Sequence, residues 1–360
     1  MPSHLAVGCS VASYDRPPQR RNLYSFSFPA RNRIYNELFI SQIEIPSFKL
    51  NDGREIPALG YGTWLALSYA IDIGYRHIDT AHLYRVEPEV GEVINKKIKE
   101  GVVKREEIFI TTKVWNHMHR EADVEKSVRG SLRRLNMDYV DLALVHWPMS
   151  ISEDGVDEKI DYLETWRGME TVLKKGLAKS IGVSNFSVEQ MQRLLANCNV
   201  PPCTNQVEIN LNLGQKELVD YCQANNVVMV AFAPFGTMIP NRLQPNSPEP
   251  KLNNPTMVAI AKKYGKTVVQ VALRYLFQRG IVSIPKTVTK SRVLENASIF
   301  DFELDKSEFE QIAKFDNGYR TVRHVFWQDY DNYPVEKLDA TAEIPLSLRK
   351  WKNGRNLDIE

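Results

Sequence analysis

The chain has 360 residues, 43% of them hydrophobic, and its 46 Lys and Arg residues nearly balance its 44 Asp and Glu residues. This composition is that of an ordinary soluble protein, and the net charge of +2 excludes a strongly basic nucleic-acid-binding protein. The longest apolar run, Val227 to Ala233, is far shorter than the roughly 20 residues that span a bilayer, which excludes a transmembrane protein.

Residues 1–43 differ in composition from the rest of the chain. They contain five arginines, no lysine and only two acidic residues, Asp15 and Glu37. An arginine-rich, acid-poor start that contains serines is typical of an organelle-targeting peptide, although Pro17 and Pro18 would break a targeting helix. We expect a disordered N-terminal extension. Organelle targeting is the alternative to the cytoplasmic location that the four sparse cysteines favour.

From about Ser47 the sequence predicts a hairpin followed by repeated β/α units. Turn-forming residues at 51–53 separate two β-runs, and we expect this hairpin to cap the N-terminal end of the fold. Apolar runs that predict strands lie at 58–62, 76–80, 108–114, 139–147, 178–184, 204–209, 227–233 and 280–285. Amphipathic stretches that predict helices lie at 88–99, 122–135, 162–174, 188–196, 215–224, 254–263 and 267–279.

This alternation predicts the α/β class, because helices between consecutive strands require parallel pairing. Eight units favour a closed (β/α)8 TIM barrel over residues 44–335, followed by a C-terminal tail at 336–360. The other candidate is a doubly wound open sheet. It is disfavoured because no G-x-G-x-x-G motif follows the first strand, where Gly60-x-Gly62 stops at the second glycine.

The first β/α unit is unusually short. Only the eleven residues from Leu65 to Tyr75 separate Trp64 from the second apolar run. A five-residue strand is roughly 17 Å long, and a helix made from this whole segment would rise only about 16 Å, which leaves nothing for the two connecting loops. We therefore expect a shortened or displaced first strand or helix, with Gly62, Thr63 and Trp64 shifted at the rim and stability lowered.

Four polar side chains are associated with three successive apolar runs. Asp79 ends the second run with Tyr84 five residues later, Lys113 lies in the third run, and His146 ends the fourth. The steps from Asp79 to Lys113 and from Lys113 to His146 are 34 and 33 residues, one β/α unit each. Because functional side chains of such barrels lie at the C-terminal ends of strands, we expect all four to share one rim.

These residue types suit the reduction of a carbonyl group. A tyrosine hydroxyl with a pKa of about 10 is a weak acid at neutral pH, but the Lys113 ammonium would stabilise the phenolate and lower this pKa. Asp79 would hold the lysine protonated, and His146 would hydrogen-bond the substrate oxygen. Side chains carry no hydride, so a nicotinamide cofactor is implied.

Several segments resemble the signature segments of the aldo-keto reductase superfamily, in the right order over about residues 46–335. These segments are GYRHIDTAHLY, IFITTKVW, LVHWP, GLAKSIGVSNF, NQVEIN and IPKTVTKSRVLENASIFDF. The resemblance implies a (β/α)8 barrel that binds NADPH. It also implies that Tyr84 is the general acid, that Lys113 and Asp79 tune it, and that His146 orients the carbonyl.

The resemblance also implies which residues hold the cofactor. They are Gly62, Thr63, Ser184, Asn185, Gln206, Phe232, Lys286, Thr287, Arg292, Glu295 and Asn296. Phe232 would stack on the nicotinamide where the family usually places tyrosine, and Ala233 replaces a serine that commonly contacts the pyrophosphate. Lys286, Thr287 and Arg292 supply two cations and a hydroxyl, which a 2′-phosphate needs and a bare ribose does not. We therefore expect NADPH rather than NADH.

Aromatic side chains at strand ends and in the C-terminal segment are expected to line the substrate pocket. They are Trp64, Trp115, Trp147, Trp327 and Tyr330. Such a wall suits an apolar carbonyl compound. The segments DYLETWRGM, APFG and WQDYDNYP are similar to insect 3-dehydroecdysone reductases of the superfamily, which implies an ecdysteroid 3-ketone as substrate. We expect a monomer.

Two other functions remain open at this point. The H-x-H pair His117 and His119 could bind a metal as in some barrel hydrolases, but no carboxylate partner is evident, and we expect no metal. The short first unit could also leave a barrel that binds NADPH without turnover.

Overall fold

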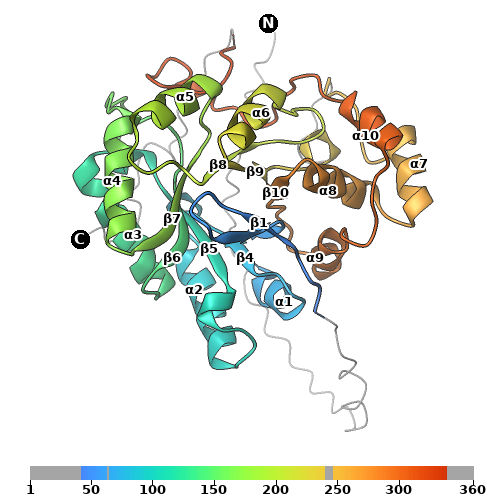
Figure 1. Ribbon diagram of the computed structural model, residues 1–360, viewed down its shortest axis with the longest axis horizontal. Coiled ribbons are helices and arrows are strands. Elements are labelled where there is room, and N and C mark those ends of the chain that lie inside the picture. The colour runs from blue at the N-terminus through green and yellow to red at the C-terminus, as the bar shows by residue number, and fades with distance from the viewer. Residues whose placement is uncertain (1–41, 63–64, 240–245, 339–360) are drawn as a thin grey trace, which may run out of the picture. The chain divides into compact units, whose positions relative to one another are not determined.

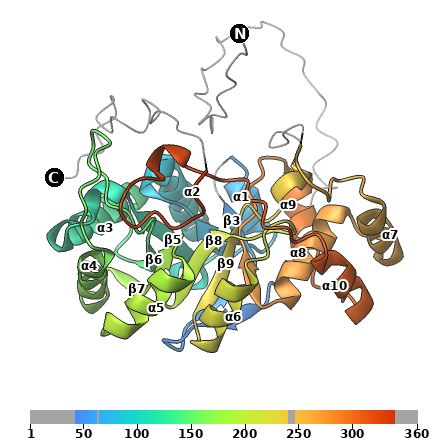
Figure 2. The same cartoon turned by 90° about the horizontal axis from the view of Figure 1, so that it is seen from above.

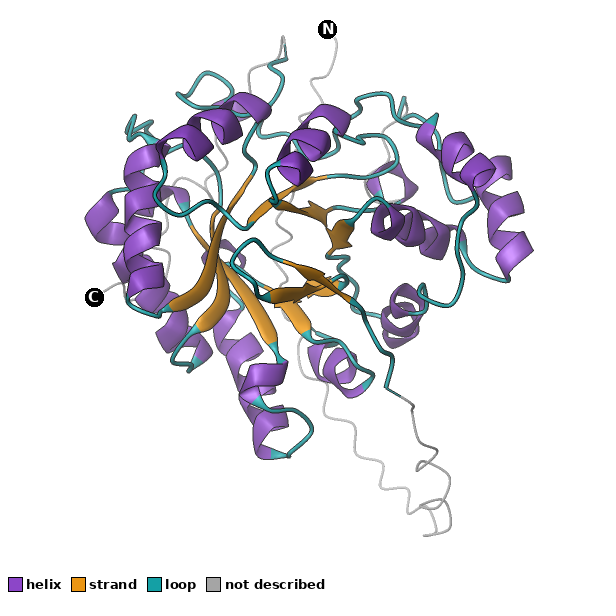
Figure 3. Cartoon of the chain, viewed as in Figure 1, coloured by secondary structure: helices purple, strands orange, loops and turns teal. Residues whose placement is uncertain are grey.

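The computed structural model describes residues 42–62, 65–239 and 246–338. Parallel strands form a single sheet in chain order, preceded by a separate antiparallel hairpin (Figure 3). The hairpin strands are β1 (Ser47–Lys49) and β2 (Glu55–Pro57), and the sheet consists of β3 (Gly60–Gly62), β4 (His77–Asp79), β5 (Phe109–Val114), β6 (Val140–Val145), β7 (Ala178–Ser184), β8 (Thr204–Glu208), β9 (Val228–Phe232) and β10 (Ile281–Ser283).

The first and last strands of the sheet meet and nearly close it into a barrel. Leu59 and Ser283 form a parallel bridge. The Ser283 N–H donates to the oxygen of Ala58 at 3.1 Å, and the Gly62 N–H donates to the oxygen of Pro285 at 3.2 Å. The predicted (β/α)8 barrel is confirmed, and the doubly wound open sheet is excluded.

Helices surround the strands on the outside of the barrel (Figure 1). They are α1 (Leu67–Asp72), α2 (Glu87–Lys99), α3 (Glu121–Leu135), α4 (Tyr162–Lys174), α5 (Val188–Asn197), α6 (Lys216–Ala224), α7 (Pro255–Tyr264), α8 (Val268–Gln278), α9 (Lys290–Ala297) and α10 (Lys306–Ala313). The seven predicted helices agree with α2 to α8 within one residue at each end. Within the described ranges, none of the helices has the length and apolar character needed to cross a bilayer.

The hairpin covers the N-terminal end of the barrel, as predicted. Asn51 Nδ2 donates to the oxygen of Pro202 at 2.9 Å, just before β8, and Arg54 Nε donates to the oxygen of Lys179 in β7 at 3.0 Å. Ile56 is fully buried in a cluster with apolar residues of β5, β6, β9 and β10. The opposite, C-terminal end of the barrel therefore stays available for a site.

The first β/α unit is short, as the sequence predicts. β3 has 3 residues and α1 has 6, whereas α2 and α3 have 13 and 15. Gly62 nevertheless pairs in register with Asp79 of β4, so the end of β3 stays aligned with its neighbour. Thr63 and Trp64 lie outside the described residues, so their predicted shift stays a prediction.

The chain after α10 runs back over the C-terminal end of the barrel towards β5 and β6 (Figure 2). Hydrogen bonds within this segment include that from Arg320 Nε to Glu336 Oε2 at 3.1 Å and that from the Leu338 N–H to Gln328 Oε1 at 2.9 Å. The predicted extension at 1–43 and tail at 336–360 lie mostly outside the described residues.

Candidate active site

A buried ion pair lies at the C-terminal ends of β4 and β5. Asp79 ends β4 and is paired in register with Thr111 of β5. Lys113 stands two residues further along β5 and therefore points to the same side of the sheet as Thr111. Its Nζ donates to Asp79 Oδ1 at 2.6 Å and to the backbone oxygen of Thr80 at 3.0 Å. Both charged side chains are almost fully buried, so they face each other away from water.

Tyr84 and His146 lie at the same rim. Tyr84 ends a 3-10 turn (His82–Tyr84) that follows β4, and its ring centroid is 5.1 Å from Lys113 Nζ. The ring centroids of Tyr84 and His146 are 6.0 Å apart, with an interplanar angle of 85°. Tyr84 is 42% exposed, whereas Lys113 is 1% exposed, so the tyrosine is the one that reaches the open rim. The structure brings together the four residues that the sequence predicts for one rim.

The pKa of the Tyr84 hydroxyl is raised above its ordinary value, which corrects the expectation of a lowered one. Withdrawal of the hydroxyl from water is the main cause, although the ring remains partly open to solvent. The Lys113 ammonium acts in the opposite direction, as expected, and the Asp79 carboxylate adds to the rise. Burial alone would lower the pKa of Lys113, but Asp79 and Tyr84 together raise it. Tyr84 therefore keeps its proton at neutral pH beside a charged lysine.

His146 is a neutral imidazole near neutral pH. Its pKa is well below the ordinary value because the ring is buried, and the Lys113 ammonium lowers it further. The backbone is fixed on both sides: its N–H donates to the oxygen of Val114 at 3.0 Å, and its oxygen accepts from Asn185 Nδ2 at 2.9 Å. A neutral imidazole can donate a hydrogen bond to a substrate oxygen.

The residues expected at the nicotinamide lie at the end of β7, in the middle of β8 and at the end of β9. Ser184 ends β7 and donates through Oγ to the backbone oxygen of Gln206 at 2.6 Å. Asn185 follows with a positive φ of 62°, and Phe232 ends β9. The Gln206 side-chain amide donates to Asp79 Oδ2 at 2.8 Å, a contact that sequence reasoning missed. Two amides and a hydroxyl thus lie beside the buried ion pair, and this set of donors and acceptors fits a carboxamide.

The remaining cofactor residues follow β10. They are Lys286, Thr287, Arg292, Glu295 and Asn296, in the loop after β10 and in α9. Both cations are exposed, and Arg292 forms no ion pair with any residue that the structure describes. Asn296 is buried, and Glu295 Oε1 accepts a hydrogen bond from Thr267 Oγ1 at 2.6 Å. Exposed cations at the start of a helix fit a phosphate group.

Gly62 approaches the same loop closely. A Cβ at this position would lie 3.1 Å from the backbone oxygen of Ile284 and 3.4 Å from Lys286 Cβ. A larger residue would therefore push on the segment that carries the cations. Of the other residues predicted for this end of β3, Thr63 and Trp64 lie outside the described chain.

An aromatic cluster covers one side of the rim. Trp115 follows β5 and Trp147 follows β6, and both contact Trp327, with ring centroids 5.9 and 6.3 Å away. Tyr330 packs against this cluster, and its hydroxyl donates to the oxygen of Gly155 at 2.5 Å. The ring of Trp115 also lies 5.0 Å from that of His146. Four of the five aromatic residues predicted for the pocket thus belong to one largely buried cluster beside the polar group.

Sequence reasoning missed a carboxylate that connects the rim to the C-terminal segment. Glu208 ends β8 and is fully buried. Its side chain accepts hydrogen bonds from the backbone N–H groups of Thr321 at 2.8 Å and Val322 at 2.9 Å. An acidic residue that ends a buried strand in NQVEI was the available signal, since a buried carboxylate needs partners.

The H-x-H pair His117 and His119 lies in the turn after β5. His119 is fully buried, and the ring of His117 lies 5.7 Å from that of His82. Among the described residues, no three His, Cys, Asp or Glu side chains converge as metal ligands. The structure gives the metal hydrolase alternative no support.

Comparisons with known proteins agree with this geometry. The Aldo/keto reductase family profile matches residues 63–317. Aldo-keto reductase AKR2E4 of Bombyx mori is 41% identical over 306 residues, which cover 81% of this chain and 99% of that protein. Aldo-keto reductase family 1 member C18 of Rattus norvegicus is 38% identical over 315 residues, which cover 81% of this chain and 98% of that protein. The chain belongs to the aldo/keto reductase family, and the predicted insect relationship is confirmed.

Solved structures extend the comparison. The crystal structure of the silkworm (Bombyx mori) aldo-keto reductase AKR2E5 in complex with NADPH has 68% identity and a TM-score of 0.85, covering 87% of this chain and 100% of that one. The structure of Bombyx mori AKR2E4 in complex with NADP has 41% identity and a TM-score of 0.80, covering 81% of this chain and 100% of that one. The predicted oxidoreductase class and its cofactor class are thus confirmed at the level of the family.

Proposed function

We propose that this protein reduces an aldehyde or ketone to an alcohol with NADPH, and that Tyr84 delivers the proton. The observation that carries the proposal is the buried Lys113–Asp79 pair, with a 2.6 Å contact, directly behind the partly exposed Tyr84. The bound cofactor supplies the hydride. What the chain must provide is a proton for the developing alkoxide and a group that holds the carbonyl oxygen in place.

The side chains at the rim divide these tasks. Tyr84 is protonated at neutral pH, so it can give its proton to the carbonyl oxygen. The phenolate that remains is stabilised by the Lys113 ammonium, whose own charge is maintained by Asp79. His146 is neutral and lies across from the tyrosine ring, from where it can orient the same oxygen by a hydrogen bond.

Residues on β7, β8 and β9, or directly after them, hold the cofactor in this proposal. Ser184, Asn185 and Gln206 bind the nicotinamide carboxamide, and Phe232 stacks on the ring. Gln206 then shares its amide with Asp79, its partner at 2.8 Å. Beyond them, the exposed cations Lys286, in the loop after β10, and Arg292, in α9, bind the 2′-phosphate. Arg292 can do so because it forms no ion pair within the described chain.

The aromatic cluster supports an apolar substrate. Trp115 lies next to His146 and packs with Trp147 and Trp327, so the surroundings of the site are apolar, which suits an extended hydrocarbon skeleton more than a small charged acid. An ecdysteroid ketone is the finer proposal, because it combines such a skeleton with a carbonyl group. We also propose a cytoplasmic monomer, since one chain supplies all of these residues and Cys198, Cys203 and Cys222 are free thiols.

The experiment is a carbonyl panel, including 3-dehydroecdysone, assayed by NADPH oxidation with the full chain and with Tyr84→Phe. We expect carbonyl-dependent oxidation by the wild type, no measurable turnover by Tyr84→Phe, and nearly equal NADPH affinity for both. Tyr139→Phe is the matched control, because Tyr139 lies before β6 at the other end of the barrel, against Arg105. Tight NADPH binding without turnover of any carbonyl would instead support a non-catalytic barrel.

A further inference from the structure

The hydroxyl of Tyr61 connects the two sides of the seam where the barrel closes. Tyr61 is the middle residue of β3 and is 1% exposed. Its Oη donates a hydrogen bond of 2.6 Å to the backbone oxygen of Thr287, in the loop after β10. Tyr61 Oη also accepts a hydrogen bond of 3.3 Å from the N–H of Ala66, at the start of α1. One buried hydroxyl thus contacts both the short first unit and the loop that carries the predicted phosphate ligands.

The contact with Ala66 ties the start of the short helix α1 to β3. Helix α1 has only 6 residues, and its N-cap residue, Ala66, has no side-chain acceptor to offer the free N–H groups of the first turn. A helix this short has little stability of its own. Tyr61 accepts from the N–H of the N-cap residue itself, so the start of this short helix is attached to the neighbouring strand.

The contact with Thr287 fixes one end of the cation-bearing segment. Tyr75, just before β4, fixes the other end, because its Oη donates to the backbone oxygen of Val293 at 3.0 Å. The rings of Tyr61 and Tyr75 pack edge to face, with centroids 5.9 Å apart. The two tyrosines therefore hold the backbone from Thr287 to Val293, which includes Arg292 and begins directly after Lys286.

We propose that Tyr61 is a positioning residue that sets the preference for NADPH over NADH. The inference rests on the proposed function, since it assumes that Lys286 and Arg292 bind the 2′-phosphate. Charge-assisted contacts depend strongly on distance and alignment, and both cations are attached to a segment that Tyr61 anchors. NADH has no phosphate at this position, so its affinity does not depend on the place of the cations.

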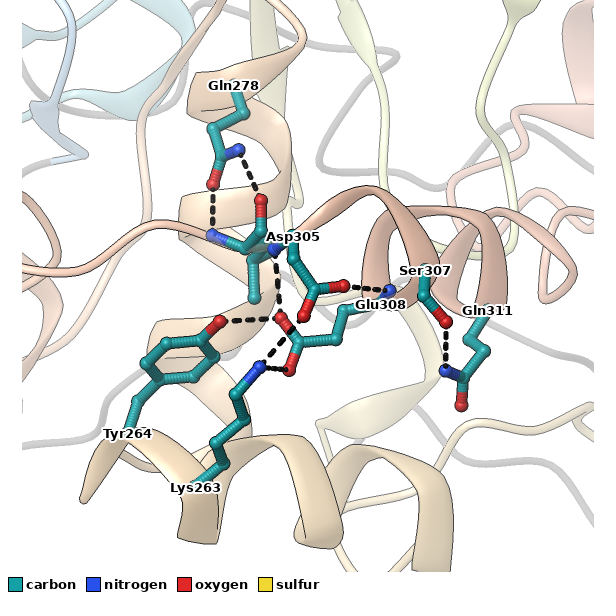
Figure 4. Close-up of polar contacts among 8 residues, drawn as sticks. Lys263, Tyr264, Gln278, Asp305, Ser307, Glu308 and Gln311 are labelled. Carbon is teal, nitrogen blue, oxygen red and sulfur yellow. Dashed lines mark hydrogen bonds and ion pairs between the residues drawn. The ribbon is translucent and has the colours of Figure 1, made fainter.

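The decisive comparison is between Tyr61→Phe, which removes only the hydroxyl, and Tyr264→Phe. The Tyr264 hydroxyl donates to Glu308 Oε2 at 2.6 Å, in a polar network of α7 and α10 that also includes Lys263 (Figure 4). This control removes a tyrosine hydroxyl from a different part of the barrel wall. Dissociation constants for NADPH and NADH are measured by fluorescence titration, and hydrogen exchange is measured across residues 287–293 without cofactor.

For Tyr61→Phe we expect NADPH to bind about fivefold more weakly, the effect of one hydrogen bond, while NADH affinity stays within about twofold. Amide exchange across residues 287–293 should become faster. Tyr264→Phe should change none of these three quantities. Equal losses for both cofactors, or unchanged NADPH affinity, would overturn the role of Tyr61 while leaving the proposed function intact. A wild-type protein that binds neither cofactor would overturn both.

Discussion

Lys113 Nζ lies 2.6 Å from Asp79 Oδ1, with both side chains almost fully buried. Removing one partner of such a pair leaves the other charge buried without compensation, which costs roughly 3–5 kcal/mol. We expect Lys113→Met to lower the free energy of unfolding by an amount of this order, as well as turnover. Urea unfolding measures the first effect, and a variant as stable as the wild type would show that Gln206 alone satisfies the Asp79 carboxylate.

Buried neutral histidines make the fold sensitive to acid. Burial lowers the pKa of His77, His117 and His324 to about 4, and that of His82 and His119 to about 3. The unfolded chain titrates near 6.5, so below this pH it binds protons that the folded chain does not. The contribution of these histidines to the free energy of unfolding is therefore complete above about pH 6.5. It is lost progressively as the pH falls towards 4. Urea unfolding at about pH 7 and about pH 5 should show lower stability at the lower pH, and equal values would contradict the assignment.

Arg292 provides a direct test of the cofactor preference. Hydrogen bonds to charged groups contribute about 1.5–3 kcal/mol each, so Arg292→Ala should weaken NADPH binding by about tenfold or more. NADH binding should change little, because NADH has no 2′-phosphate. Arg167→Ala is a suitable control, since Arg167 is an exposed arginine on α4 that pairs with Glu121. If Arg292→Ala weakened both cofactors alike, the residue would not face the phosphate.

Much of this structure followed from local sequence patterns. The strand and helix ranges agree because each unit repeats an apolar run and an amphipathic stretch, and the steps of 34 and 33 residues placed Asp79, Lys113 and His146 on one rim. The contacts from Tyr61 to Thr287 and from Glu208 to Thr321 were not predicted. They join residues 226 and 113 positions apart, and no local period reports such a contact. The direction of the Tyr84 pKa shift was also missed, because it depends on the balance between burial and Lys113.

The N-terminal boundary can be tested by truncation. The sequence alone predicts that residues 1–43 are dispensable for folding and that a chain beginning near Ile45 melts where the full chain does. The structure corrects the boundary, because the Ile43 N–H donates to the oxygen of Ile73 at 3.0 Å. A chain that begins at Gln42 should therefore melt at the same temperature as the full chain, whereas one that begins at Ile45 should melt slightly lower. A clear drop for the first truncation would mean that the preceding residues stabilise the barrel.

Glu208 links the end of β8 to the C-terminal segment that carries Trp327. Its carboxylate accepts from the backbone N–H groups of Thr321 and Val322 and from the Thr321 hydroxyl, so Glu208→Ala leaves these three donors without their partner and loosens the segment. We expect a higher KM for bulky apolar carbonyl substrates, together with faster hydrogen exchange over residues 321–327. NADPH affinity should stay nearly unchanged, because Glu208 bonds to the C-terminal segment, whereas Gln206, the predicted cofactor residue on the same strand, bonds to Asp79. Glu336→Ala, which removes the exposed partner of Arg320 in the same segment, should have a smaller effect. An equal rise in KM for small and bulky aldehydes would show that Glu208 does not act through the aromatic wall of the pocket.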